Sequence, residues 1–288
     1  MRPAPFAYSA PETIPEVVEE LRDPDRDARI LAGGQSLIPM LNLRIARFDR
    51  LVDIGRVAGL AGIRCEQDTA VIGATTTHTD IERSAELAER LPIMREAASH
   101  IGHHAIRNRG TLGGSISHAD PSAEWPTVVT ALGASMRVVG SGGERRVDAR
   151  GFFRDHFTSA LEPDELLVDL TVPLPVPGTG WSFMEFARQS GAFALALVAV
   201  LVRLDERGAI GHACVAVGGC GSQPMLPDPA PLVGLRPADS ARAATHVLGA
   251  ELSPAGDIHA SAEDRRRIAE VLIERALARA MFRARRPD

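Results

Sequence analysis

The sequence predicts an α+β protein with two domains, in which mixed helices and short strands precede a smaller region of three antiparallel strands and helices. The chain has 288 residues with 45% hydrophobic content, which is enough to bury a substantial core. Proline and glycine crowd residues 173–180, which breaks any regular element and indicates a domain boundary. Beyond it, apolar runs of strand length alternate with turn residues. We therefore expect one domain over residues 1–175 and a second over 176–288.

The first domain begins with a helix that the sequence predicts over residues 13–21. Thr13 and Glu16 have the spacing of a capping box, in which each side chain bonds the other's backbone amide. Ile93, Ala97 and Ile101 have the spacing of one buried helical face. The further elements expected here are strands at 28–31, 51–54, 70–73, 135–139 and 145–147, and helices at 80–87, 92–101 and 126–132.

The second domain is expected to hold a meander of three strands. Asp205-Glu-Arg-Gly208 has the composition of a turn between two of them. Residues 225–237 are rich in proline and are expected to be extended. The elements predicted in this domain are strands at 181–186, 194–203 and 209–217, then helices at 238–248 and 262–283.

Two diglycine turns, each ending in a serine, are the most informative motifs: AGGQS at residues 32–36 and TLGGS at 111–115. Glycine has no Cβ, so the backbone can approach a ligand closely. Successive amide N–H groups in such a turn form an electropositive hollow that suits phosphate oxygens. A single turn of this kind is more often structural, whereas two in one domain could bind a pyrophosphate from two sides.

The residues around these turns resemble a known family. The run LAGGQSLIPMLNLR at 31–44, followed by LVDI at 51–54, is similar to the first FAD-binding motif of the molybdenum hydroxylase flavoproteins. The run IGHHAIRNRGTLGGS at 101–115, with HADPSAE at 118–124, is similar to the second. The similarity continues through PDELL at 163–167 to the helical end of the chain. The chain thus resembles the medium subunit of carbon monoxide dehydrogenase and the flavin domain of xanthine dehydrogenase.

The resemblance implies an FAD-binding domain of the vanillyl-alcohol-oxidase (PCMH) type at 1–175, with subdomains of about 1–56 and 57–175. A C-terminal domain of the carbon monoxide dehydrogenase flavoprotein type would follow at 176–288. FAD would bind non-covalently between the subdomains, with its pyrophosphate at the two turns. The cofactor-binding residues that the resemblance implies are Ala32, Gly33, Gly34, Gln35, Ser36, Leu37, Ile101, Gly110, Thr111, Gly113, Gly114, Ser115, Glu124, Leu167 and Phe193.

Some of these residues have implied roles away from the turns. Glu124 would accept hydrogen bonds from ribose hydroxyls, and Ile101 and Leu167 would contribute apolar contacts near the rings or the adenine. Residues 191–194 would lie beside the isoalloxazine, where the chain has Gly-Ala-Phe-Ala in place of the frequent Gly-Asp-Tyr-Ala. The aromatic ring of Phe193 is retained, while the missing carboxylate and hydroxyl leave the electron acceptor open among NAD⁺, a quinone, oxygen or another carrier.

The implied function is that of the electron-output subunit of a heterotrimeric hydroxylase. A large subunit would carry the molybdenum cofactor, and a small subunit would relay electrons through [2Fe-2S] clusters. The complex is expected to be a dimer of heterotrimers, and this chain would hold no metal and no catalytic acid or base. Two alternatives remain open: a stand-alone flavin oxidase, and a scaffold subunit with a vacant flavin cleft.

Composition excludes several other classes. All 32 basic residues are arginine, so there is neither a P-loop lysine nor a lysine Schiff base. The three cysteines are too few and too scattered for an iron–sulfur cluster. A net charge of −5 argues against nucleic-acid binding, and the longest apolar run is shorter than a membrane span. His100, His103 and His104 have metal-like spacing but no nearby completing ligand, so packing is the favoured interpretation. With no apolar leader at residues 1–6, we expect a cytoplasmic protein.

Overall fold

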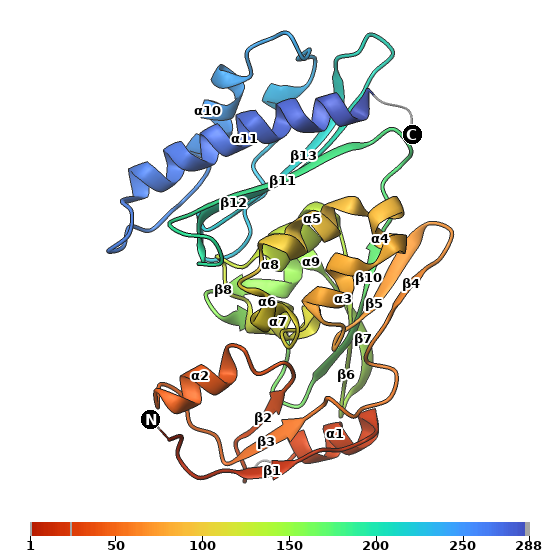
Figure 1. The fold of residues 1–288 in the computed structure, drawn as a ribbon, viewed down its shortest axis with the longest axis vertical. Coiled ribbons are helices and arrows are strands. Elements are labelled where there is room, and N and C mark those ends of the chain that lie inside the picture. Colours follow the sequence, from red (N-terminus) through yellow and green to blue (C-terminus); the bar gives the residue numbers. More distant parts are fainter. Residues whose placement is uncertain (1, 24, 286–288) are drawn as a thin grey trace.

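The computed structural model describes residues 2–23 and 25–285, and its elements form three units along the long axis (Figure 1). The N-terminal unit lies at one end, a five-stranded sheet with its helices lies in the middle, and a three-stranded sheet with two helices lies at the other end. The predicted α+β class and the C-terminal antiparallel sheet are confirmed.

The N-terminal unit is a small parallel sheet with one helix on it. Strands β1 (Ala7–Ser9), β3 (Arg50–Asp53) and β2 (Ala28–Leu31) lie in that order, and α1 (Ile14–Leu21) begins at the predicted capping box of Thr13 and Glu16. After β2, the first diglycine turn leads directly into α2 (Leu37–Asn42).

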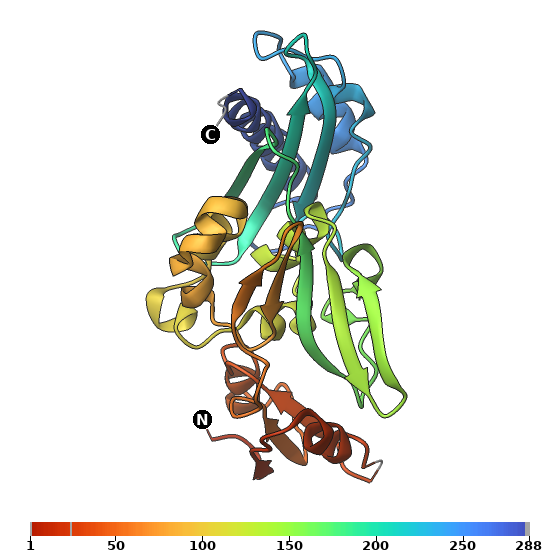
Figure 2. The ribbon, with the colours of Figure 1, turned by 90° about the vertical axis from the view of Figure 1, so that its right-hand side faces the viewer.

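The middle unit is an antiparallel sheet with strand order β4-β5-β10-β6-β7 and helices over one face (Figures 1 and 2). The second diglycine turn begins one of these helices, α7, and α7 packs against the central strand β10. The strands are β4 (Ile63–Cys65), β5 (Thr69–Gly73), β6 (Ser135–Gly140), β7 (Gly143–Asp148) and β10 (Leu166–Pro173), with a separate hairpin of β8 (Phe153–Asp155) and β9 (Thr158–Ser159). The helices are α3 (His78–Arg83), α4 (Ala85–Arg90), α5 (Pro92–His100), α6 (His104–Arg107), α7 (Leu112–His118), α8 (Glu124–Ala131) and α9 (Ala149–Phe152).

The C-terminal unit is the predicted meander of β11 (Gly180–Ala187), β12 (Ala194–Leu204) and β13 (Ile210–Gly218). Helices α10 (Arg242–Ala250) and α11 (Ala262–Ala284) cover its outer face, and a short 3-10 turn, η1 (Ala230–Leu232), lies in the proline-rich loop. The inner face packs on α5 and α8 of the middle unit. This sheet is therefore covered on both sides.

Some strands contribute to two hydrophobic cores, and β12 and β10 are examples. In β12, Val198 and Val200 face α11, whereas Leu197 and Ala199 join the core of the middle unit. In β10, Leu166 and Val168 complete the core of the N-terminal unit, and Leu170 and Val172 face the helices of the middle unit. Alternate residues of a strand point to opposite faces, which explains the division in β12. In β10 a bulge between Leu167 and Asp169 shifts the alternation, so residues on either side of it join different cores.

Several predicted boundaries are wrong. The helix expected at 80–87 is two helices, because Ser84 leaves the helical conformation at ψ 116° and caps α4 by accepting the Leu87 amide. The helix expected at 238–248 begins only at Arg242, after the turn that follows Pro237. Among the elements that were not predicted, β10 matters most. Its apolar run is interrupted by Asp169, whose Oδ2 accepts a 2.7 Å hydrogen bond from Arg137 Nε on β6.

Candidate cofactor site

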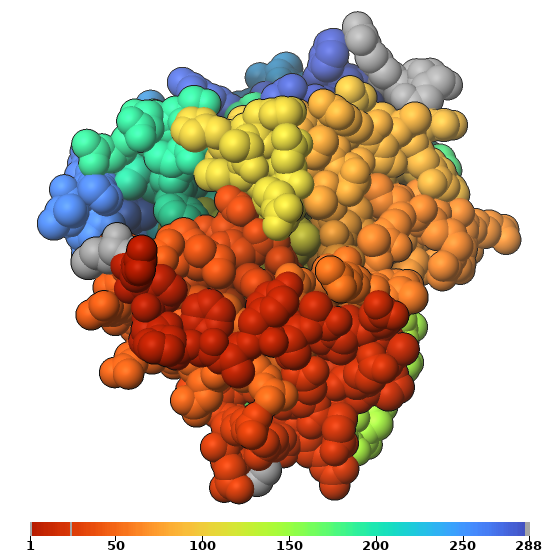
Figure 3. Space-filling view, turned by 60° about the horizontal axis from the view of Figure 1, so that its bottom comes forward, coloured from red at the N-terminus to blue at the C-terminus, as the bar shows by residue number. Residues whose placement is uncertain are grey.

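The two diglycine turns lie directly against one another. A Cβ on Gly33 would lie 2.1 Å from the carbonyl oxygen of Arg109 and 2.8 Å from Cα of Gly110. A Cβ on Gly114 would lie 3.6 Å from Cβ of Ala32. In the space-filling view the N-terminal segment (red to orange) contacts the segment near residue 110 (yellow) (Figure 3). The fold thus brings together two motifs that are almost eighty residues apart.

The first turn exposes a row of unused donors. Within the described residues, no acceptor is present for the backbone amides of Gly33, Gly34, Gln35 and Ser36. Gly34 has φ +73°, the left-handed region that lets consecutive amides converge on one side. Ser36 precedes α2 and its hydroxyl caps nothing, so it remains available. This turn has the hydrogen-bonding capacity that a phosphate requires.

The second turn differs from the expected open nest of amides. The Gly113 amide donates to Ala74 O at 2.8 Å, and the Gly114 amide donates to Oγ1 of Thr111 at 3.1 Å. The Ser115 amide also bonds within the turn. The Thr111 side chain caps α7. Among the described residues of this turn, Thr111 is the one whose backbone amide has no acceptor. The second turn therefore lets a ligand approach its backbone closely, and it offers one backbone amide and the Ser115 hydroxyl as donors.

A buried histidine fixes the start of the second turn. His78 is 4% exposed, its amide donates to Gly110 O at 3.0 Å, and a Cβ on Gly110 would lie 2.7 Å from Nε2 of His78. Nε1 of Trp125 lies 3.0 Å from Nδ1 of His78 and donates to it. Burial, with a smaller effect from Arg107, lowers the pKa of His78 to about 4, so the ring is neutral at physiological pH.

The two arginines near the turn have different roles. Arg107 Nε bonds Glu82 at 2.9 Å, and its Nη1 donates to the carbonyls of Ile101 and Gly102. It therefore holds the 101–102 loop. Arg109 is exposed, and its side chain has no partner among residues 2–23 and 25–285. The backbone carbonyl of Arg109 adjoins Gly33 of the first turn.

The third segment of the candidate site adjoins the second. A Cβ on Gly191, which has φ +77°, would lie 2.8 Å from Cε1 of His103. In Figure 3 the green-blue segment near residue 190 borders the yellow segment. Phe193 is 68% exposed, so its ring is free to pack on a bound molecule.

Two of the expected apolar contacts lie within the protein core. Ile101 is 8% exposed and Leu167 is 2% exposed, and both side chains belong to the core of the middle unit. Leu167 lies on β10 next to Val168, whose carbonyl accepts the Ala74 amide behind the second turn. A contact from Leu167 to a ligand would therefore have to come largely from its backbone.

Glu124 is the first residue of α8 and lies among other acids. Burial is the main cause that raises the pKa of Glu124 to about 8, and the charge of Glu185 adds to it. The pKa of this carboxyl therefore lies well above its ordinary value. His78, Trp125 and Glu185 were not predicted from the sequence, because no local pattern marks side chains that act on a turn from distant elements.

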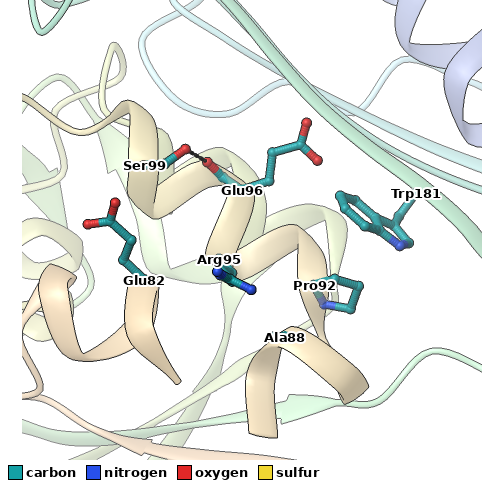
Figure 4. Close-up of a pocket in the computed structure, with 7 residues that line it drawn as sticks. All are labelled: Glu82, Ala88, Pro92, Arg95, Glu96, Ser99 and Trp181. Atoms are coloured by element: carbon teal, nitrogen blue, oxygen red, sulfur yellow. Dashed lines mark hydrogen bonds between the residues drawn. The ribbon is translucent and has the colours of Figure 1, made fainter. Parts of the chain in front are cut away.

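A separate hollow lies between α5 and the start of β11 (Figure 4). It measures about 380 Å³, and Trp181 faces Pro92 and Glu96 across it. Its two carboxylates already have partners: Glu82 binds Arg107, and Glu96 binds arginines of α11. None of the residues that line this hollow belongs to either glycine turn.

The three clustered histidines have separate partners. His100 lies 3.3 Å from Glu185, His103 contacts Gly191, and His104 lies 3.2 Å from Asn108. Over the described part of the chain, no group of three histidine, cysteine or acidic residues could hold a metal ion. No helix in that part is long and apolar enough to cross a membrane.

Comparisons with known proteins agree with this geometry. Residues 4–175 match the model of the FAD binding domain in molybdopterin dehydrogenase, and residues 181–280 match the CO dehydrogenase flavoprotein C-terminal domain. The chain is 40% identical to the 6-hydroxypseudooxynicotine dehydrogenase complex subunit alpha of Paenarthrobacter nicotinovorans, over 99% of this chain and 97% of that one. It is 35% identical to the carbon monoxide dehydrogenase medium chain of Hydrogenophaga pseudoflava, over 98% and 99%. A solved carbon monoxide dehydrogenase from Hydrogenophaga pseudoflava, which lacks the Mo-pyranopterin moiety, superposes with a TM-score of 0.94 at 37% identity, covering 98% of this chain and 99% of that one.

Proposed function

The chain belongs to the FAD-binding medium subunits of the molybdenum hydroxylase family, and we propose that it transfers electrons from a [2Fe-2S] partner to an external acceptor. It is a flavoprotein subunit of a molybdenum-containing dehydrogenase. The observation that carries the proposal is the contact between the two glycine turns, beside a row of amides that have no acceptor in the described chain.

The residues present fit a non-covalent FAD. The amides of residues 33–36 and of Thr111, together with the hydroxyls of Ser36 and Ser115, would hold the pyrophosphate. Arg109 would balance its charge. The Phe193 ring would pack beside the isoalloxazine, and Glu124 would bond a cofactor hydroxyl. The full set of proposed contacts remains Ala32, Gly33, Gly34, Gln35, Ser36, Leu37, Ile101, Gly110, Thr111, Gly113, Gly114, Ser115, Glu124, Leu167 and Phe193.

The protein's own contribution is binding, orientation and exclusion of water. FAD, when bound, supplies the redox chemistry, because it can take up electrons one at a time and release them singly or in pairs. His78, which accepts a hydrogen bond from Trp125, contacts Gly110 and would hold the start of the second turn in place for the ligand. Such preorganisation reduces the cost of ordering the site on binding.

The proposed assembly is a heterotrimer with a large molybdenum-cofactor subunit and a small [2Fe-2S] subunit, present as a dimer of heterotrimers. The carbon monoxide dehydrogenase relatives support this proposal. Substrate oxidation would take place on the large subunit, so the isolated chain should not hydroxylate substrate. We propose the domain division at 1–175 and 176–288 for the same complex.

The test begins with the purified chain. Acid precipitation should release about one FAD per chain into the supernatant, and metal analysis should find neither iron nor molybdenum. Dithionite should reduce the flavin. Mixing with the cognate large and small subunits should restore electron transfer from substrate to acceptor.

The alternatives give different results in the same experiment. A protein that never binds flavin under any condition would be a scaffold with a vacant cleft. A chain that oxidises a substrate without its partners would be a stand-alone oxidase. Flavin that stays with the acid-precipitated protein would contradict non-covalent binding.

A further inference from the structure

Strand β12 begins with a bulge directly after Phe193. Ala194 and Ala196 pair with successive residues of β11, so Leu195 between them has no partner on that strand. The bulge shifts the alternation of side chains: Ala194 belongs to the core of the middle unit, whereas Ala196 packs in the core beneath α11. In a regular strand these two residues would share a face. The bulge therefore determines how the chain that carries Phe193 enters the sheet.

A buried arginine of α11 binds the backbone at this bulge. Arg265 is 7% exposed, and its Nη1 donates to Leu195 O at 2.7 Å and to Gly219 O at 3.3 Å. Its Nη2 donates to Oδ2 of Asp257 at 2.8 Å. Gly219 has φ +72°, and a Cβ there would lie 2.9 Å from Leu195 O. One guanidinium thus holds the start of β12 against the residue that follows β13.

Gly219 connects the same arginine to the loop before α8. Its amide donates to Pro121 O at 2.8 Å. Pro121 lies three residues before Glu124, in the run that is similar to the second FAD-binding motif. Arg265 therefore binds the backbone next to one proposed cofactor contact, Phe193, and is linked through Gly219 to the segment that carries another.

The loop before α11 also holds the other arm of the β11–β12 hairpin. Arg188 follows β11, and its Nη1 donates to Nδ1 of His259 at 2.7 Å. The His259 amide donates to Oδ1 of Asp257 at 2.8 Å, so the acid that binds Arg265 also orders this loop. Both arms of the hairpin that carries Phe193 are thus attached to one short segment.

The place of Arg265 is unfavourable for a cation. It is the fourth residue of α11, and the N-terminal end of a helix carries partial positive charge. Burial adds a desolvation cost, which Asp257 offsets in part, and Nε is buried without a hydrogen-bond partner among the described residues. An apolar side chain would avoid these costs but could not bind two carbonyls. The reason for an arginine here therefore lies in the backbone that it holds.

We propose that Arg265 is a positioning residue for the flavin, which fixes the β12 bulge so that Phe193 lies against the isoalloxazine. The inference rests on the proposed function and on the place of Phe193 within it. Among the described residues, the Arg265 side chain bonds Leu195, Gly219 and Asp257, and none of these belongs to a glycine turn. Loss of Arg265 should therefore leave FAD bound while it changes the surroundings of the ring.

The experiment compares the flavin absorption spectra of holoprotein variants. Arg265→Gln keeps a donor but cannot bind both carbonyls and Asp257 together. We expect full FAD content and a spectral change of the same sign as that of Phe193→Ala, and no larger. Arg266→Gln is the matched control, because Arg266 is the next residue of α11 and its Nη2 binds Leu252 O at 3.3 Å instead. Its spectrum should be that of the wild type.

A double variant distinguishes positioning from a general effect on the fold. If Arg265 acts through Phe193, Arg265→Gln should change nothing further once Phe193→Ala is present. The flavin spectrum and the rate of electron transfer to the acceptor, measured in the complex with the cognate subunits, should then equal those of Phe193→Ala alone. Independent effects would instead multiply in the rate.

A milder variant keeps the test decisive if Arg265→Gln does not fold. Asp257→Asn removes the charge of a half-exposed partner and leaves both carbonyl bonds possible. It should change the flavin spectrum in the same direction by a smaller amount, and circular dichroism confirms its fold. A wild-type spectrum in both folded Asp257→Asn and folded Arg265→Gln would overturn the inference, as would one in Asp257→Asn where Arg265→Gln does not fold.

The other outcomes separate the inference from the proposed function. Multiplying effects in the double variant, a wild-type spectrum in Phe193→Ala, an Arg266→Gln change as large as that of Arg265→Gln, or loss of FAD from Arg265→Gln would each refute the positioning role. In all of these cases the wild type still binds FAD. A wild-type chain that never binds FAD would instead refute the proposed function.

Discussion

Replacing Gly33 by alanine tests the central contact of the site. The added Cβ would lie 2.1 Å from Arg109 O, where carbon and oxygen normally approach to about 3.4 Å. Both groups in this contact belong to the backbone, so no flexible side chain can move away. The turns must separate by roughly 1 Å, which is enough to lengthen hydrogen bonds from an anion held between them beyond a useful distance.

The expected loss follows from the number of bonds affected. Hydrogen bonds to a charged group contribute about 1.5–3 kcal/mol each, so losing one or two costs roughly 2–4 kcal/mol. That corresponds to a roughly 30- to 1000-fold higher dissociation constant for FAD. Fluorescence titration of flavin-stripped protein measures this directly, and circular dichroism confirms that the variant is folded.

Gly151→Ala is the matched control, since Gly151 lies in α9 with nothing within 4 Å of an added Cβ. It should bind FAD as the wild type does. If Gly33→Ala also bound FAD with wild-type affinity, the two turns would not need their close contact, and the argument for a shared pyrophosphate site would be wrong.

Two further predictions test other parts of the molecule. Phe193→Ala should change the flavin absorption spectrum and slow electron transfer to the acceptor, because the exposed ring would no longer pack on the flavin. Reduction of the iron–sulfur partner by substrate should be unaffected. A variant with the wild-type spectrum and turnover would show that the isoalloxazine lies elsewhere. Gly180→Ala would place a Cβ 1.8 Å from the carbonyl oxygen of Ala280 and push α11 away from β11. We expect a loss of about 3 kcal/mol in the free energy of unfolding, measured by denaturant titration, and an unchanged midpoint would contradict this packing.

The sequence could predict those elements whose residues agree with their local structure. The capping box at Thr13 and the turn at Asp205–Gly208 are local, and both lie where they were expected. Residues 194–202 are apolar at every position, and both faces of β12 are buried over this stretch. Strand β10 was missed because its one charged residue is neutralised only by a residue on a neighbouring strand.

The site shows the same division between local and distant effects. The glycine turns are visible in the sequence because close approach excludes other residues. The sequence does not show that the two turns differ in free amides. Two amides of the second turn donate to the carbonyl oxygens of Thr76 and Ala74, which lie on the segment after β5. Nor could the raised pKa of Glu124 be predicted, because it results from burial in the fold and from the charge of Glu185 on β11, about sixty residues away.

The C-terminal sheet, which is buried on both faces, determines how the chain can be divided. Residues 176–179 look like a natural cutting point, yet the fragment that ends there would lose Phe183, Leu197 and Ala199, which complete the core of the middle unit. The apolar sides of α5 and α8 would then face water, and an exposed patch of this kind favours aggregation. A flavin-binding piece shortened for crystallisation or for biosensing therefore has to keep the C-terminal sheet, or replace that face with polar residues.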